Sequence, residues 1–81
     1  MLSKIKDVKN RHRDFLMSLP NVVSLGIGPK IVKRSATGTT AIKVFVSRKV
    51  PLSDLASDER IPELIEGFQT DVEVMERLKA L

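Results

Sequence analysis

Residues 21–48 have the sequence NVVSLGIGPKIVKRSATGTTAIKVFVSR, in which two apolar runs flank a polar segment. In the first run Val23, Leu25 and Ile27 alternate with small residues, and alternate residues from 40 to 47 are again apolar. A period of two is typical of strands with one buried face. Residues 33–39 between the runs are polar and include Gly38, which allows a positive φ. The stretch therefore predicts an antiparallel hairpin with a long tip.

Two glycines give the first predicted strand a face with almost no side-chain volume. Gly26 and Gly28 lie on that face, which allows a bulge, a closely packed helix or another backbone segment to approach. Pro29 follows them and has no N–H to donate to a neighbouring strand. We therefore expect Pro29 at a bulge or on an open edge of the sheet.

Residues 2–19 are predicted to form one amphipathic helix that ends before Pro20 and packs its apolar stripe on the hairpin. His12, the only histidine, lies within that stripe. It could serve as a metal ligand, a general base or a pH-sensitive group. However, zinc sites need three or four ligands, and the chain offers His12 no second histidine and no cysteine. We expect a buried or rim histidine that bonds to the backbone.

The second half of the chain predicts turns and one further strand. Residues 51–60 favour short turns or a single helical turn, and residues 61–67 favour either one helical turn or an extended loop. Residues 69–76 alternate again and predict a strand. Its carboxylates, Asp71 and Glu73, are expected to face water.

The whole chain, residues 1–81, is predicted to be a single α+β domain in which the N-terminal helix packs on a three-stranded sheet. The strands are expected near residues 21–33, 40–48 and 69–76, with the third beside the first and antiparallel to it, in the order 2-1-3. The expected core consists of Ile5, Val8, Phe15, Leu16, Leu19, Val23, Leu25, Ile27, Ile42, Val44, Val46, Leu55, Ile61, Ile65, Val72 and Val74.

Length and composition exclude several classes of protein. A domain of 81 residues has a small core, which dimerisation would supplement. The absence of cysteine excludes disulfides, thiolate zinc sites and a thiol nucleophile. No apolar run approaches the roughly 18 residues of a membrane span, and the N-terminus lacks the apolar region of a signal peptide. We expect a cytoplasmic protein that does not bind a membrane.

Charge is distributed unevenly along the chain. Residues 1–50 hold 11 basic and 2 acidic side chains, a net charge of +9, whereas residues 51–81 hold 3 basic and 8 acidic ones, a net charge of −5. Such asymmetry is found at nucleic-acid-binding surfaces. It is equally expected where the acidic half folds back on the basic half, or on a second copy of the chain.

A nucleic-acid-binding surface is one hypothesis for the basic half. With no Tyr, no Trp and three Phe, the chain offers little for stacking on bases. The candidate residues for this function are Lys4, Lys6, Lys9, Arg11, Arg13, Lys30, Lys33, Arg34, Lys43, Arg48 and Lys49.

No catalytic or nucleotide-binding motif is found. Gly26 and Gly28 are not followed by a third glycine and a helix, as a dinucleotide-binding turn requires. Ser24 lies outside any nucleophile elbow, and the acidic residues do not match a calcium loop. We expect no enzyme activity, no cofactor and no metal site.

Three segments stand out together: residues 21–28, 41–51 and 60–72, with the sequences NVVSLGIG, AIKVFVSRKVP and RIPELIEGFQTDV. As a set they resemble the part that precedes the trypsin-like peptidase domain in a group of bacterial proteins. Pro29 and Glu66 depart from that pattern. The catalytic His, Asp and Ser of the peptidase domain have no counterparts here. The resemblance implies a small, non-catalytic accessory domain that binds a protein partner or associates with itself.

Overall fold

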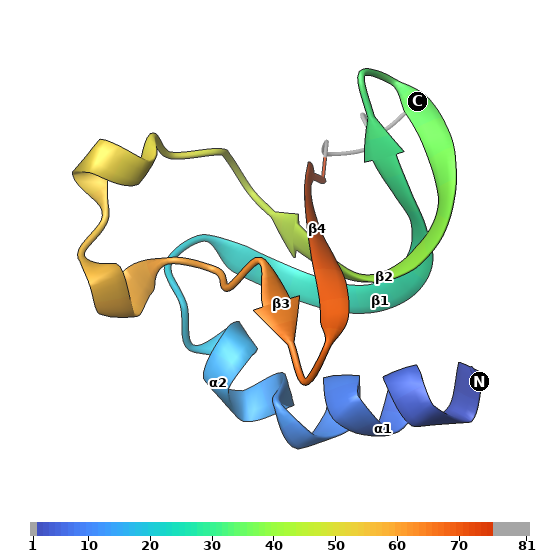
Figure 1. The fold of residues 1–81 in the computed structure, drawn as a ribbon. Coiled ribbons are helices and arrows are strands. Elements are labelled where there is room, and N and C mark those ends of the chain that lie inside the picture. Colours follow the sequence, from blue (N-terminus) through green and yellow to red (C-terminus); the bar gives the residue numbers. More distant parts are fainter. Residues whose placement is uncertain (1, 76–81) are drawn as a thin grey trace, which may run out of the picture.

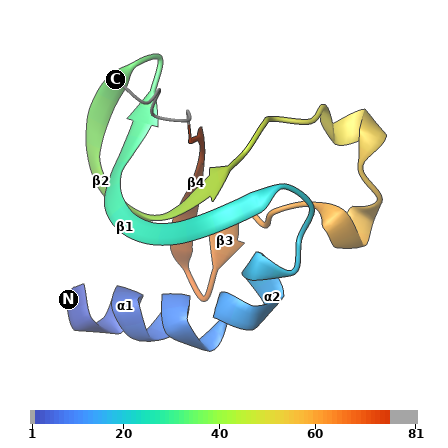
Figure 2. The same ribbon diagram turned by 180° about the vertical axis from the view of Figure 1, so that it is seen from behind.

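The chain begins with two short helices and continues into a sheet of four strands. The computed structural model describes residues 2–75. The elements are α1 (Leu2–Arg11), α2 (Arg13–Met17), β1 (Val22–Val32), β2 (Ser35–Val46), the 3₁₀ turns η1 (Leu52–Asp54) and η2 (Ser57–Glu59), β3 (Leu64–Ile65) and β4 (Phe68–Val74). Both helices lie against one face of the sheet, so the expected α+β class is confirmed (Figures 1 and 2).

The predicted helix over residues 2–19 bends at His12, where φ is −100° and ψ is 5°. Helical hydrogen bonds continue across the bend, because the Leu16 N–H donates to the His12 carbonyl at 2.9 Å. The Ser18 N–H and hydroxyl both donate to the Phe15 carbonyl. These bonds satisfy the last turn, and α2 ends at Met17, three residues before Pro20.

The hairpin of β1 and β2 is confirmed, but its tip is shorter than predicted. Lys33 and Arg34 form a two-residue turn with φ values of 51° and 67°, the geometry that matches the twist of the flanking strands. Gly38 also has a positive φ, 82°, but it lies within β2. The pairing shifts register between Pro29 and Ile31. Pro29 therefore stands beside an irregularity on an edge strand, as its missing N–H predicts.

The predicted strand order 2-1-3 is wrong. The sheet has the order β1-β2-β4-β3, and β4 runs parallel to β2 rather than antiparallel to β1. In this register Lys43 pairs with Asp71 and Val44 with Val72. The parallel register brings Lys43 within ion-pair distance of Asp71 and Glu73, an attraction that the apolar alternation alone does not reveal.

Strand β3 was predicted as a helical turn or a loop. It pairs with β4 through a tight turn at Glu66 and Gly67, whose φ values are 49° and 85°. The Thr70 N–H also donates to the Glu63 carbonyl at 3.0 Å, and the Thr70 hydroxyl donates to the Pro62 carbonyl. These bonds hold the segment before β3 in an extended form.

The core lies between the helices and the sheet. Most of the expected residues belong to it, but Phe15, Val23 and Val74 are between 41% and 46% exposed. Val23 is displaced because the β1–β2 pairing shifts register between Val22 and Ser24, so Val22 packs against the core instead. The buried apolar residues are Ile5, Val8, Leu16, Leu19, Ala41, Ile42, Val44, Val46 and Ile65.

Candidate functional site

A buried ion pair occupies the sheet face opposite the helices. The Lys43 Nζ lies 2.6 Å from Asp71 Oδ2 and 3.0 Å from Glu73 Oε2. The side chains of Lys43 and Asp71 are 7% and 12% exposed, whereas Glu73 is 46% exposed. The expectation that both carboxylates face water is therefore wrong for Asp71.

The outer half of the hairpin bends over this face and bonds to it. In Figure 1 the hairpin curves away from the helices toward the end of β4. The Ile31 N–H donates to Asp71 Oδ2 at 3.0 Å, and Lys43 Nζ donates to the Pro29 carbonyl at 3.1 Å. Lys30 Nζ donates to Gln69 Oε1 at 2.9 Å. The ion pair thus fastens the curved hairpin to β4.

Side chains from β2 fill the space above the two glycines. A Cβ at Gly26 would lie 3.2 Å from Phe45 Cε2, and one at Gly28 would lie 3.6 Å from Lys43 Cγ. The glycines therefore make room for Phe45 and for the aliphatic part of Lys43, not for a helix or another backbone segment.

Opposing effects act on the ionisation of Asp71 and Lys43. Burial raises the pKa of the Asp71 carboxyl, but hydrogen bonds from Lys43 and the Ile31 amide, with the charges of Lys43 and Lys30, bring it below its ordinary value. Burial lowers the pKa of Lys43, but its bonds to Asp71 and Glu73 raise it above its ordinary value overall. Both groups therefore stay charged at neutral pH, and the cluster is suited to holding structure rather than to proton transfer.

A second polar cluster joins the helix bend to the β3–β4 turn. Glu66 accepts a hydrogen bond from Arg11 Nη2 at 2.6 Å, and its other oxygen lies 2.8 Å from His12 Nε2. His12, 35% exposed, is therefore a rim histidine, but it bonds to a carboxylate and not to the backbone. The bonds from Arg11 and then His12 hold the pKa of Glu66 below its ordinary value.

We expect the stability of the domain to fall in acid because the pKa of Glu66 is lowered by folding. Its contribution is fully present above the unfolded value, roughly 4.3, and is lost as pH falls through the folded value. Glu66→Gln should therefore melt below wild type at pH 7, and the two proteins should converge near pH 2. Melting followed by circular dichroism from pH 7 to 2 measures this. Glu63→Gln is the control, and a constant gap at all pH values would contradict the expectation.

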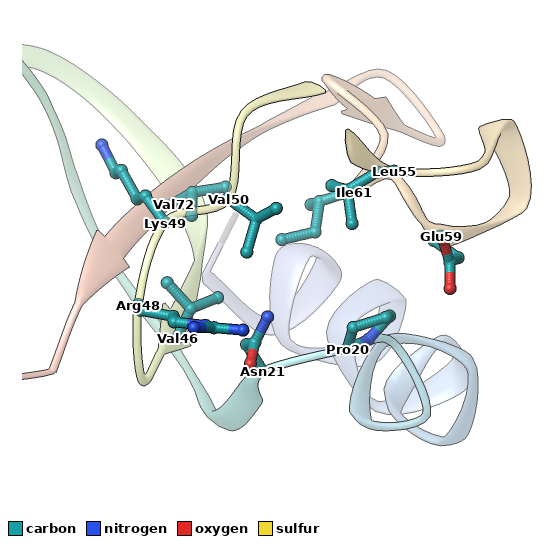
Figure 3. A pocket seen from close by; sticks show the side chains of 10 residues that line it. All are labelled: Pro20, Asn21, Val46, Arg48, Lys49, Val50, Leu55, Glu59, Ile61 and Val72. Atoms are coloured by element: carbon teal, nitrogen blue, oxygen red, sulfur yellow. The ribbon is translucent and has the colours of Figure 1, made fainter. Parts of the chain in front are cut away.

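An apolar pocket lies beside the end of β2. Its volume is about 210 Å³. Figure 3 shows the side chains of Val50, Leu55 and Ile61 turned toward the same space, with Pro20 across from them. In the same view Arg48 extends toward Asn21 (Figure 3). The complete lining is Pro20, Asn21, Val46, Arg48, Lys49, Val50, Leu55, Glu59, Ile61 and Val72.

Local hydrogen bonds hold the pocket walls in place. The Ser47 N–H donates to the Asn21 carbonyl at 2.8 Å, which fixes the start of β1 against the end of β2. In the opposite wall, the Ala56 N–H donates to Glu59 Oε1 at 2.8 Å and the Glu59 N–H returns a bond to the Ala56 carbonyl. This reciprocal pair caps η2, so the wall is ordered although the segment has little regular structure.

A second, more polar hollow adjoins the pocket. Lys49 and Val72 line both recesses. The hollow has a volume of about 340 Å³ and lies between the hairpin tip and β4. Its lining is Ile31, Lys33, Arg34, Lys49, Asp71, Val72, Glu73 and Val74.

The candidate nucleic-acid-binding residues do not form one surface. Lys4, Lys6, Lys9, Arg11 and Arg13 lie on or beside the helices, whereas Lys30, Lys33 and Arg34 lie on the hairpin, which points away from them (Figure 2). Lys43 is buried, and Arg11 is engaged by Glu66. The ion pairs between Arg11 and Glu66 and between Lys43 and the β4 carboxylates join the basic half to the acidic half, as one of the two expectations from charge predicts.

Among residues 2–75, no three His, Asp or Glu side chains gather as a metal site would require. Over the same residues, neither helix has the length and apolarity needed to cross a bilayer. No protein-family model matches the chain, and no curated protein matches it.

Sequence reasoning missed both recesses. The pocket combines side chains from the link between α2 and β1, the end of β2, the connection between β2 and β3, and β4. Local sequence patterns do not predict that these separate segments come together. The ion pair had a weak signal, since Lys43 stands between apolar neighbours in a strand and Asp71 alternates with valines.

Proposed function

We propose that this chain is a non-catalytic accessory domain that binds a protein partner in the apolar pocket. The observation that carries the proposal is the pocket itself, whose walls are aliphatic and whose rim carries Arg48 and Lys49. Interfaces of this kind place one apolar anchor in a recess and surround it with polar contacts. The resemblance to a segment that accompanies peptidase domains supports the same class of role.

The polar clusters support binding rather than catalysis. Lys43 and Asp71 bond to each other and to backbone groups of the hairpin. Glu66, the other strongly engaged carboxylate, ties the helix bend to a turn. A general base or acid needs a group of suitable pKa within reach of a substrate, and the apolar pocket is lined by aliphatic side chains with Glu59 committed to capping η2.

Nucleic-acid binding is the second candidate and is less well supported. Its cations are divided among the helices, the hairpin and the segment after β2, and two of them, Arg11 and Lys43, are engaged in ion pairs. Neighbouring phosphates are bound best by cations that share one surface, because the affinity grows with the number of phosphates neutralised.

Peptide selection tests the proposed function. We expect the immobilised domain to enrich related sequences from a random peptide library, and Leu55→Glu to weaken binding of the enriched peptides at least tenfold. A buried aliphatic contact is worth about 1.5–3 kcal/mol, and a carboxylate in its place would lose its hydration when an apolar group covered it. Binding is measured by fluorescence anisotropy.

Leu64→Glu is the matched control. It makes the same substitution at a side chain that is 60% exposed and lines neither recess. The control should bind as wild type does. Equal losses in both variants, or no enrichment by the wild type, would overturn the proposed function.

A further inference from the structure

The charged side chains around the apolar pocket differ in whether they have an ion-pair or hydrogen-bond partner. Arg48 and Lys49 stand at the rim, are exposed, and make no ion pair with any residue from 2 to 75. Lys33 and Arg34 continue the positive charge into the adjoining hollow. The four cations therefore border one continuous surface that runs from the pocket to the hairpin tip.

The carboxylates on this surface are already engaged. Asp71 and Glu73 in the hollow bind Lys43, and Glu59 at the pocket accepts the Ala56 N–H. A ligand that reaches the surface therefore meets four cations beside carboxylates with existing partners. The electrostatic potential of these four cations attracts acidic ligands and repels basic ones.

The pocket volume restricts what can enter it. Small-molecule sites begin at roughly 300 Å³, and this pocket has about 210 Å³. A single aliphatic side chain is a better match in size, and the walls offer it Val46, Val50, Leu55 and Ile61. In many interfaces a few buried anchor residues supply most of the binding energy.

We propose that the partner presents an acidic segment with one aliphatic side chain, which enters the pocket while flanking carboxylates contact Arg48 and Lys49. This inference rests on the proposed function, because it names the chemistry of the ligand for the same pocket. Lys33 and Arg34 are placed to bind carboxylates further along the segment. In an extended peptide alternate side chains point to the same side, so carboxylates two residues before and after the anchor face the same surface as the anchor.

Labelled peptides test the ligand chemistry on the full 81-residue chain. The first probe is a short peptide of aspartates and glutamates around a central leucine, and the second has alanine in place of the leucine. The third surrounds the leucine with lysines, and the fourth is a single-stranded DNA of similar length. We expect the acidic leucine probe to bind at least tenfold more tightly than each of the others, with affinity that falls as salt rises.

Paired charge variants test the residues. The double variant Arg48→Gln/Lys49→Gln should bind the acidic leucine probe about tenfold more weakly, since each of the two exposed charge contacts is worth a few-fold in affinity. The control Lys4→Gln/Lys6→Gln removes the same charge from exposed positions on α1 and should bind as wild type does. Equal losses in the two double variants would overturn the assignment to Arg48 and Lys49.

The outcomes separate this inference from the proposed function. If library peptides are enriched and blocked by Leu55→Glu but the acidic leucine probe does not bind, the acidic ligand is wrong and the binding domain stands. If the DNA binds as tightly as the acidic leucine probe and is displaced by it, the surface is a general anion site and the inference fails. Light scattering at the same protein concentrations tests for self-association. If the chain forms dimers without any probe, a second copy of the chain is the occupant of the pocket, and the inference is overturned.

Discussion

Asp71→Ala is expected to lower the free energy of unfolding by about 3 kcal/mol. The substitution leaves the 7%-exposed Lys43 without its nearest carboxylate and the Ile31 N–H without its acceptor. Glu73 remains within 3.0 Å of Lys43, so the expected loss is at the lower end of the range for a broken buried pair. For a domain of this size, such a loss corresponds to a fall in melting temperature of roughly 12–24 °C. Urea unfolding and thermal melts measure both quantities.

Two further variants isolate the buried charge as the cause. Glu73→Gln alters the 46%-exposed partner and should cost less than about 1 kcal/mol. The double variant Lys43→Met/Asp71→Leu should be more stable than Asp71→Ala, because it leaves no buried charge unpaired. If Asp71→Ala cost no more than Glu73→Gln, the pair would not be what holds the hairpin on β4.

Leu16→Ala is expected to cost about 3 kcal/mol, because Leu16 is fully buried and belongs to the cluster that joins the helices to the sheet. Phe15→Ala, one residue earlier in the same helix, should cost about 1 kcal/mol or less, since Phe15 is 46% exposed. Both changes introduce the same residue into the same short helix, so helix propensity cancels approximately. If urea unfolding gave similar losses of stability for Leu16→Ala and Phe15→Ala, the idea that α2 is anchored to the core mainly through Leu16 would be wrong.

Much of the fold could be predicted because it depends on local patterns. The alternation of Val23, Leu25 and Ile27 and of Ile42, Val44 and Val46 locates the two long strands, and Pro20 limits the helix. The position of β4 could not be predicted in this way. Its alternation fits antiparallel pairing with β1 as well as parallel pairing with β2, and the choice depends on Lys43 and Asp71 meeting across 28 residues.

The candidate site was less predictable than the fold for the same reason. Arg48 and Lys49 were recognised as cations, but their proposed role in binding depends on the pocket beside them. It also depends on which nearby carboxylates already have partners. Lys43 belonged to the same list of cations and proves to be buried. Sequence gives the charge of each residue, whereas the ion-pair partners that decide which charges are free come from segments far apart in the chain.

The parallel pairing of β2 and β4 has a consequence for the order in which the chain folds. The hairpin closes through a two-residue turn, while the partner of Lys43 arrives 28 residues later. Loop closure over the longer distance costs more entropy, and non-local pairing slows folding. The hairpin is thus expected to form first, with β4 docking after the rate-limiting step. In that case the Asp71→Ala loss will be found mainly in a faster unfolding rate, with the refolding rate nearly unchanged.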